Sequence, residues 1–333
     1  MYSGAAARWL AAFLVGLAGI SYTFAASDAG STGDAAPVPA SAAVPAMAAH
    51  QVSPSAWYVQ GLSALGSPAN QNFISNAGFV TTPAGVVVID ALGSPALAQR
   101  LLAEIRKHTD KPVTHVILTH YHADHIYGLQ TFKAAGAMII ANEHARDYLT
   151  SDTARLRLEQ SRKDLAPWID ANTHLVPADR WLTGDTELVI GGMRFQIRHV
   201  GPAHTPEDEV IYLPDERVLF AGDVVFRGRI PFVGQADSGH WVTALDSLLT
   251  FDAQVIVPGH GPASHQARED MELTRDYLLY LRKVMGEAAK NLDPWEDAYR
   301  AADWSRFEHL PLFRVANRMN AYNTYLLMQN EVH

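Results

Sequence analysis

The 333-residue sequence contains no cysteine. This absence excludes every thiolate metal site and every cysteine nucleophile, so a bound metal would have to use His, Asp or Glu. It also excludes disulfides, so a folded core has to stabilise the protein. With 48% hydrophobic residues, the chain is long enough for one large domain or for a domain with appendages.

The sequence also lacks an excess of positive charge. Its 26 Lys and Arg stand against 35 Asp and Glu, which gives a formal net charge of -9. Nucleic acids are bound mainly through basic side chains that neutralise phosphates. We therefore expect no nucleic-acid partner.

No apolar run reaches the length of about 20 residues that a membrane-spanning helix needs. The N-terminus instead carries Arg8, the apolar run from Trp9 to Ile20, and small residues around Ala25 and Ala26, which is the pattern of an export signal. We expect residues 1–26 to be a cleaved signal peptide and the mature protein to be periplasmic or secreted, without stable membrane insertion. An uncleaved anchor is the alternative, and the exact cleavage site stays open.

The next segment, residues 27–55, is rich in Ala, Pro and Ser, a composition that buries little surface. It predicts a disordered linker. We expect a folded domain over residues 56–265 and a helical extension over residues 266–333. The oligomeric state stays open.

The body of the chain repeats the order strand, loop, helix. Residues 77–92 predict a hairpin that turns at Pro83-Ala84-Gly85, and Ser94 followed by proline predicts the start of a helix. Residues 112–120 predict a strand that is covered on both faces. Further apolar runs suggest two strand-rich halves with helices outside, an α/β arrangement.

Side chains that commonly bind metal ions are concentrated in the stretch THYHADHIYG, residues 119–128, which begins at the end of the predicted strand 112–120. His120 and His122, at alternate positions, can point the same way, while Asp124 and His125 can reach a point further along. The stretch thus offers ligands to two adjacent sites. Imidazole with carboxylate suits zinc, iron or manganese better than calcium or magnesium.

Four residues cannot close two sites, so further ligands are expected at other strand ends. His204 lies in GPAHTP, Asp223 in FAGD and His260 in VPGHG. Each follows or ends a predicted strand and stands beside Gly or Pro, which would fix a tight loop. These three residues are the predicted partners of the first four.

Together these motifs resemble the metallo-β-lactamase-fold hydrolases, whose pattern is His-x-His-x-Asp-His, a later His, an Asp after Gly, and a His between glycines. The resemblance extends from about Gln71 to Ser264, and Asp90 fits an acidic strand-end position of the family. It implies a four-layer αββα sandwich of two facing mixed β-sheets, here with a C-terminal helical extension.

The resemblance also implies how the site is divided. One metal would be held by His120, His122 and His204, a second by Asp124, His125 and His260, and Asp223 would bridge them. The implied cofactors are two Zn²⁺ ions with a hydroxide between them as the nucleophile, which Asp124 would orient as the catalytic residue. The implied activity is hydrolysis of an ester, thioester, lactone or lactam carbonyl in a small-molecule substrate.

Departures from the family pattern keep other interpretations open. The best-known lactamases have Arg at the position of His125 and Cys at that of Asp223. The combination of His125 and Asp223 resembles instead that of glyoxalase II thioesterases, lactonases and exported proteins associated with sulfur-oxidation or quinoprotein systems. One alternative is an enzyme like the persulfide dioxygenases with a single Fe²⁺. Another is a non-catalytic periplasmic module that binds a metal or a partner, and a third is a site that no longer binds metal.

Two further residues are candidates for substrate contact. His240 lies in the long segment after Asp223, where loops often line a pocket, and Tyr121 lies inside the histidine-rich stretch. The alternative for Tyr121 is buried packing. Arg227 and Arg229 could meet an anionic substrate or be solvated.

Overall fold

The computed structural model describes residues 46–234 and 236–332. The predicted signal peptide and most of the predicted linker therefore lie outside the described residues. Within those two ranges, no helix combines the length and the apolar character that crossing a lipid bilayer requires.

The first sheet contains the strands of the N-terminal half in sequence order. It comprises β1 (Ala49–Gln51), β2 (Ala56–Val59), β3 (Ala77–Thr82), β4 (Gly85–Ile89), β5 (Val113–Ile117), β6 (Met138–Asn142) and β7 (Arg180–Leu182). The pairs from β1 to β4 are antiparallel, and those from β4 to β7 are parallel. The sheet is therefore mixed, as predicted.

The sheet begins earlier than the composition of the chain predicts. β1 lies inside the stretch 27–55 that is predicted to be a linker, and it pairs with β2. Met47 is buried, the Ala49 amide donates to Glu104 Oε1, and the His50 ring lies 5.5 Å from that of Tyr58. These tertiary contacts order a segment whose own composition favours no structure.

The second sheet contains the later strands in the order β12-β11-β10-β9-β8. Their bounds are β8 (Thr186–Ile190), β9 (Met193–His199), β10 (Glu209–Leu213), β11 (Val218–Phe226) and β12 (Val255–His260). All neighbours are antiparallel except β11 and β12, which are parallel. This sheet is also mixed.

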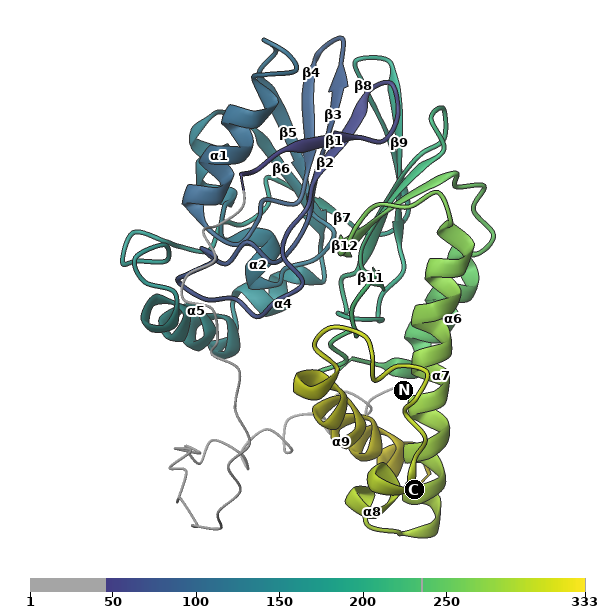
Figure 1. Cartoon of the computed structure of the whole chain (residues 1–333). Helices are drawn as coiled ribbons and strands as arrows, with labels where there is room; N and C mark the ends of the chain where they lie inside the picture. Colours follow the sequence, from purple (N-terminus) through teal and green to yellow (C-terminus); the bar gives the residue numbers. More distant parts are fainter. Residues whose placement is uncertain (1–45, 235, 333) are drawn as a thin grey trace, which may run out of the picture. The chain divides into compact units, whose positions relative to one another are not determined.

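Helices flank both sheets (Figure 1). They are α1 (Pro95–Ile105), α2 (Ala123–Ile126), α3 (Leu129–Ala134), α4 (Ala145–Leu149), α5 (Asp152–Asp164), α6 (Ser238–Leu248), α7 (Ala267–Asn291), α8 (Trp295–Ala301) and α9 (Phe313–Val332). The predicted N-cap of α1 is present, since the Leu97 amide donates to Ser94 Oγ.

Three apolar clusters separate four layers. Side chains alternate between the two faces of a strand, so Val86 and Val88 of β4 pack with the α1 side while Val87 and Ile89 face the second sheet. On the far side, the second sheet packs against α6, α7 and α9. The predicted sandwich of two facing mixed sheets with helices outside is confirmed. The division into domains at residue 265 stays a prediction.

A buried carboxyl joins the two sheets. Asn142 Nδ2 of β6 donates to Glu209 Oε1 of β10 at 3.1 Å, and Glu209 Oε2 has no hydrogen-bond partner within the described ranges. Burial raises the pKa of Glu209 to about 8, from an ordinary value of 4.5. Glu209 is therefore protonated in the folded protein at neutral pH.

This raised pKa predicts how stability changes with pH. Between about pH 4.5 and 8, folded Glu209 holds a proton that the unfolded chain has released, so its contribution to stability falls as pH rises. In this window the parent is expected to lose roughly 1.4 kcal/mol of its free energy of unfolding per pH unit through this group. We expect Glu209→Gln not to show that loss. Urea unfolding of both proteins at pH 5.5 and 7.5, with equal metal loading, measures the difference. Parallel pH profiles would contradict the raised pKa.

Candidate metal centre

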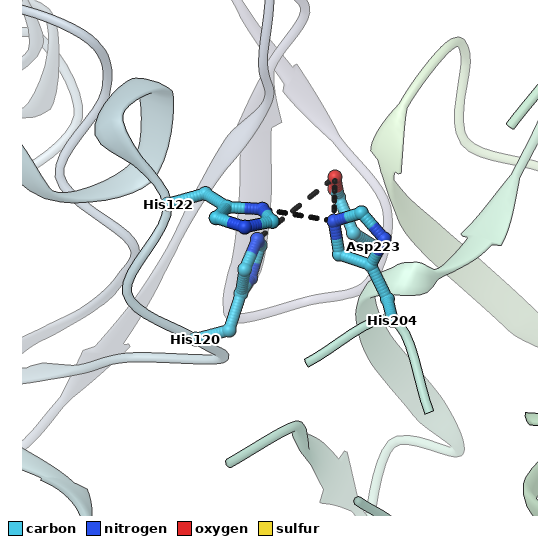
Figure 2. Close-up of side chains that lie close together, drawn as sticks. All are labelled: His120, His122, His204 and Asp223. Atoms are coloured by element: carbon cyan, nitrogen blue, oxygen red, sulfur yellow. Dashed lines mark hydrogen bonds and ion pairs between the residues drawn. The ribbon is translucent and has the colours of Figure 1, made fainter. Parts of the chain in front are cut away.

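The seven predicted ligands meet at one edge of the two sheets. They form two groups whose ligand atoms lie within 4.8 Å of one another: His120, His122, His204 and Asp223 in the first, and Asp124, His125 and His260 in the second. Figure 2 shows the three imidazoles of the first group turned toward one another and toward Asp223. This is the same division into two groups that the family resemblance implies.

The ligands come from four segments that are distant in sequence. His120 lies in the loop after β5, His122 caps α2, and Asp124 and His125 lie within that short helix. The remaining ligands are supplied by the loop between β9 and β10 (His204), by β11 (Asp223) and by the last position of β12 (His260). Two strands, a loop between strands and the segment that follows β5 thus bring these side chains to the same place.

The sequence predicts that Asp223 lies at the end of its strand. In the structure, β11 continues past it to Phe226. Its pairing with β12 is irregular between Gly222 and Phe226. Gly222 has φ of +51°, and a Cβ there would lie 2.6 Å from Thr119 Cβ. A glycine with this backbone conformation redirects the following side chain, in the manner of a β-bulge.

Asp223 is shared by the two groups. Its Oδ2 lies 3.4 Å from His204 Nε2 and 3.3 Å from His260 Nε2. Its Oδ1 lies 3.3 Å from His125 Nε2. One carboxylate thus reaches ligand atoms of both groups, which is the geometry that a bridging ligand needs.

Several ligand atoms of the cluster lack a hydrogen-bond partner, although His204 Nε2 lies at hydrogen-bond distance, 2.9 Å, from His122 Nδ1. Three buried ligand atoms have no partner among the described residues, namely His120 Nε2, His125 Nε2 and Asp223 Oδ1, and the other ring nitrogen of His204, Nδ1, has none either. Buried polar atoms are nearly always paired, so such a concentration calls for an additional partner. A set of imidazole and carboxylate ligands without sulfur suits zinc, iron or manganese.

Hydrogen bonds fix the tautomers of three imidazoles. The Nδ1–H groups of His125 and His120 donate to Asp90 Oδ2 at 2.9 Å and to Thr119 Oγ1 at 3.0 Å. Thr119 Oγ1 in turn donates to Asp90 Oδ2, and Ile74 O accepts from His260 Nδ1–H at 2.6 Å. With Nδ1 held in this way, each ring turns its Nε2 toward the cluster, as metal-binding histidines do.

The pKa values of the cluster residues also differ between the two ligand groups. Burial lowers the pKa of His120 and of His204 and brings that of His122 to about 3, so these rings are neutral. Burial opposes charge on Asp223 too, but His260 and His125 outweigh it and hold its pKa well below the ordinary value. Burial opposes charge on His125 and His260 as well, but Asp223 outweighs it and raises the pKa of both rings, that of His125 well above the ordinary value. The first group thus offers neutral imidazoles beside an ionised carboxylate, whereas a cation bound by the second group would displace the Nε2 protons of its two imidazoles.

Residues that the sequence does not single out hold His260 in place. Asn76 Nδ2 donates to Pro258 O and to Gly261 O, both at 2.7 Å, and the Asn76 amide donates to Gly259 O. A Cβ at Gly259 would lie 2.0 Å from Asp223 Oδ1, so only glycine allows this approach. The flanking glycines of His260 are visible in the sequence, whereas nothing in it identifies Asn76.

The structure separates the other candidates from the cluster. Tyr121 is fully buried, its hydroxyl donates to Val176 O at 3.1 Å, and its ring lies near Trp181, so it belongs to the core. This burial disagrees with the predicted substrate contact and agrees with the packing alternative. His240 is exposed and bonds to Asp237 at the start of α6, and its substrate role stays a prediction.

The two arginine candidates lie in different surroundings, and their contact with an anionic substrate stays a prediction. Arg227 pairs with Asp270 of α7 at 2.9 Å. Arg229 is buried, with its Nη1 3.0 Å from His260 Nδ1, so it is not solvated.

Comparisons with known proteins agree with this geometry. The chain is 29% identical over 238 residues to a linear primary-alkylsulfatase from Pseudomonas sp. (strain ATCC 19151), which covers 61% of this chain and 45% of that protein. It is 28% identical over 192 residues to a metallo-beta-lactamase type 2 from Bacillus cereus, covering 56% and 67%. The chain thus spans less than half the length of the alkylsulfatase.

Solved structures share the fold. A stereoselective inverting sec-alkylsulfatase from Pseudomonas sp. superposes with a TM-score of 0.67 at 18% identity, over 84% of this chain and 50% of that one. None of these relatives bears the name of a glyoxalase II or of a sulfur-oxidation or quinoprotein-associated protein, so that narrower assignment stays a prediction. The family model for the metallo-beta-lactamase superfamily matches residues 71–260, which include all seven cluster residues and more than half of the chain. The chain belongs to the metallo-beta-lactamase superfamily.

Proposed function

We propose that this chain is an exported metal-dependent hydrolase with two zinc ions in the cluster, acting on a small-molecule ester, thioester, lactone or lactam. The observation that carries the proposal is the pair of ligand groups joined by Asp223. Relatives named as an alkylsulfatase and as beta-lactamases support a hydrolytic activity. Export rests on the N-terminal apolar run alone.

Different residues would hold the two ions. His120, His122 and His204 would hold one ion, Asp124, His125 and His260 the other, and Asp223 would contact both. When bound, such ions supply a hydroxide near neutral pH, because they lower the pKa of water from 15.7 towards about 7, and they polarise the substrate carbonyl.

Asp124 has the position of a group that orients the nucleophile in this scheme. Its side chain is 16% exposed, more than that of any other carboxylate in the cluster, and its Oδ2 lies 3.3 Å from His260 Nε2. The pKa of Asp124 is held below its ordinary value, where burial is outweighed by His125 and His260. An ionised carboxylate at the accessible side of the cluster can accept a hydrogen bond from the nucleophile and so orient it, whereas its lowered pKa makes it a weak base.

A second candidate is hydrolysis of an alkyl sulfate ester. The alignment with the linear primary-alkylsulfatase covers more of this chain than the alignment with the Bacillus cereus lactamase does. A shared fold hosts several reactions, so the substrate has to be decided by assay.

A panel of thioesters, lactones, β-lactams, carboxylic esters and alkyl sulfates tests the proposal. We expect the zinc-loaded protein to hydrolyse at least one class, and we expect a chelator to abolish that activity and added zinc to restore it. Hydrolysis that persists at full rate after chelation would contradict a metal-dependent mechanism. An absence of turnover in every class at full metal occupancy would favour the non-catalytic interpretation.

A further inference from the structure

The loop of residues 227–233, which follows β11, contacts His260 at two points. The Arg227 amide donates to His260 O at 3.1 Å, and Arg229 Nη1 lies 3.0 Å from His260 Nδ1. The Phe226 ring, just before the loop, is stacked on the imidazole at 5.3 Å between centroids and 7° between planes. His260 is thus contacted by this loop at its backbone and at its ring edge, and by the last residue of β11 on its ring face.

Arg229 and His260 lie against each other without a hydrogen bond between them. Because Ile74 O can only accept, His260 Nδ1 carries the proton and cannot accept another from the guanidinium. Arg229 is 4% exposed, stacks on Phe226 and Phe232, and forms no ion pair within the described parts of the chain. A buried charge without a carboxylate partner is costly, so the loop needs anchors that keep it in place.

Those anchors come from the C-terminal helical region. The Ile230 amide donates to Pro311 O at 3.0 Å. Asn320 of α9 holds the loop at two further points: its Nδ2 donates to Pro231 O at 2.7 Å, and its Oδ1 accepts from the Val233 amide at 2.9 Å. One side chain, almost ninety residues further along the chain, thus donates to a carbonyl of the loop and accepts from one of its amides.

Asn320 is itself fixed. It is fully buried, and its Nδ2 also donates to the Tyr277 hydroxyl of α7 at 2.9 Å, which donates to Asn317 Oδ1 at 2.8 Å. Every donor and acceptor of the Asn320 amide therefore has a partner. A fully satisfied buried network of this kind specifies one conformation of the groups that it joins.

We propose that Asn320 is a positioning residue for the metal centre: it holds the 227–233 loop, and the loop holds His260 in the geometry that the second ligand group requires. The inference rests on the proposed function only in that it needs the cluster to bind two metal ions. It assigns the C-terminal region a role in metal binding, although none of its residues is a ligand.

The test is zinc binding to the full chain, measured by titration against a chromophoric chelator. In Asn320→Leu, which keeps the approximate volume and removes the loop contacts, we expect one zinc equivalent to bind at least tenfold more weakly and the other to be unchanged. Thr324→Val is the matched control, since Thr324 is buried in the same helix but its hydroxyl has no hydrogen-bond partner among the described residues and does not contact the loop. It should bind both equivalents as the parent does.

Thermal unfolding of both variants shows whether the comparison is fair. If Asn320→Leu does not fold, Asn320→Ser, which is smaller and keeps a hydroxyl, is measured in its place with the same expected result. Equal zinc binding by parent and Asn320 variant, or equal losses in the Asn320 and Thr324 variants, would overturn the inference. A parent chain that never binds a second zinc would contradict the proposed dinuclear site itself, which is a different failure.

Discussion

Replacing Asp223 with alanine is expected to weaken retention of both metal ions and to lower hydrolysis at least a hundredfold. The reason is geometric, because one carboxylate lies 3.3 to 3.4 Å from ligand nitrogens of both groups. Its removal would leave the histidines of each group without the negative charge that they share. Metal content after gel filtration and initial rates on the best substrate of the panel measure the two effects.

The matched control for this change is Asp215→Ala. Asp215 is an exposed partner of Arg194 at the end of β10, and surface ion pairs of this kind contribute about 0 to 1 kcal/mol. We expect the control to keep both metal content and rate. An Asp223→Ala protein that retains two ions and full turnover would show that this carboxylate does not bridge.

Changing Asp90 to asparagine is expected to lower metal affinity by ten- to a hundredfold without removing any ligand. Asp90 Oδ2 accepts from His125 Nδ1 and from Thr119 Oγ1, and Oδ1 accepts from the Thr119 amide. An amide has only one acceptor oxygen, so its NH₂ must face either His125 or the Thr119 amide. In the first orientation His125 loses the bond that keeps its Nε2 free for metal.

Metal affinity of Asp90→Asn can be compared with that of Asp90→Glu, which keeps the charge but displaces it by one methylene. Both should bind metal more weakly than the parent while keeping the helical circular dichroism signal. If Asp90→Asn bound metal with unchanged affinity, the tautomer of His125 would not depend on this carboxylate.

The local parts of the fold could be predicted from the sequence because they depend on neighbouring residues. The hairpin at Pro83-Ala84-Gly85, the N-cap at Ser94 and the strand before His120 follow from turn chemistry, capping and apolar runs. The seven cluster residues could be grouped because their motif spacing resembles that of a known family. Spacing alone gave two candidate sites but no partners across the sheets.

Features that depend on contacts between distant segments could not be predicted. β1 pairs with β2 and bonds to Glu104, and β11 continues past Asp223 after a glycine, Gly222, with a positive φ. Asn76 and Asn320 bind loops far from them in sequence, and a single asparagine carries no pattern that shows this. Tyr121 was a substrate candidate because of its neighbours in sequence, whereas its neighbours in space make it a core residue.

Metal content tests the central proposal most directly. It is measured by elemental mass spectrometry on the chain from Ser27 onward, purified without chelators and without a metal-binding tag. Two zinc ions per chain are expected from the two ligand groups joined by Asp223. One iron per chain with little zinc would contradict the dinuclear hydrolase and favour the mononuclear iron enzyme, with Asp223 as a direct ligand of that single ion.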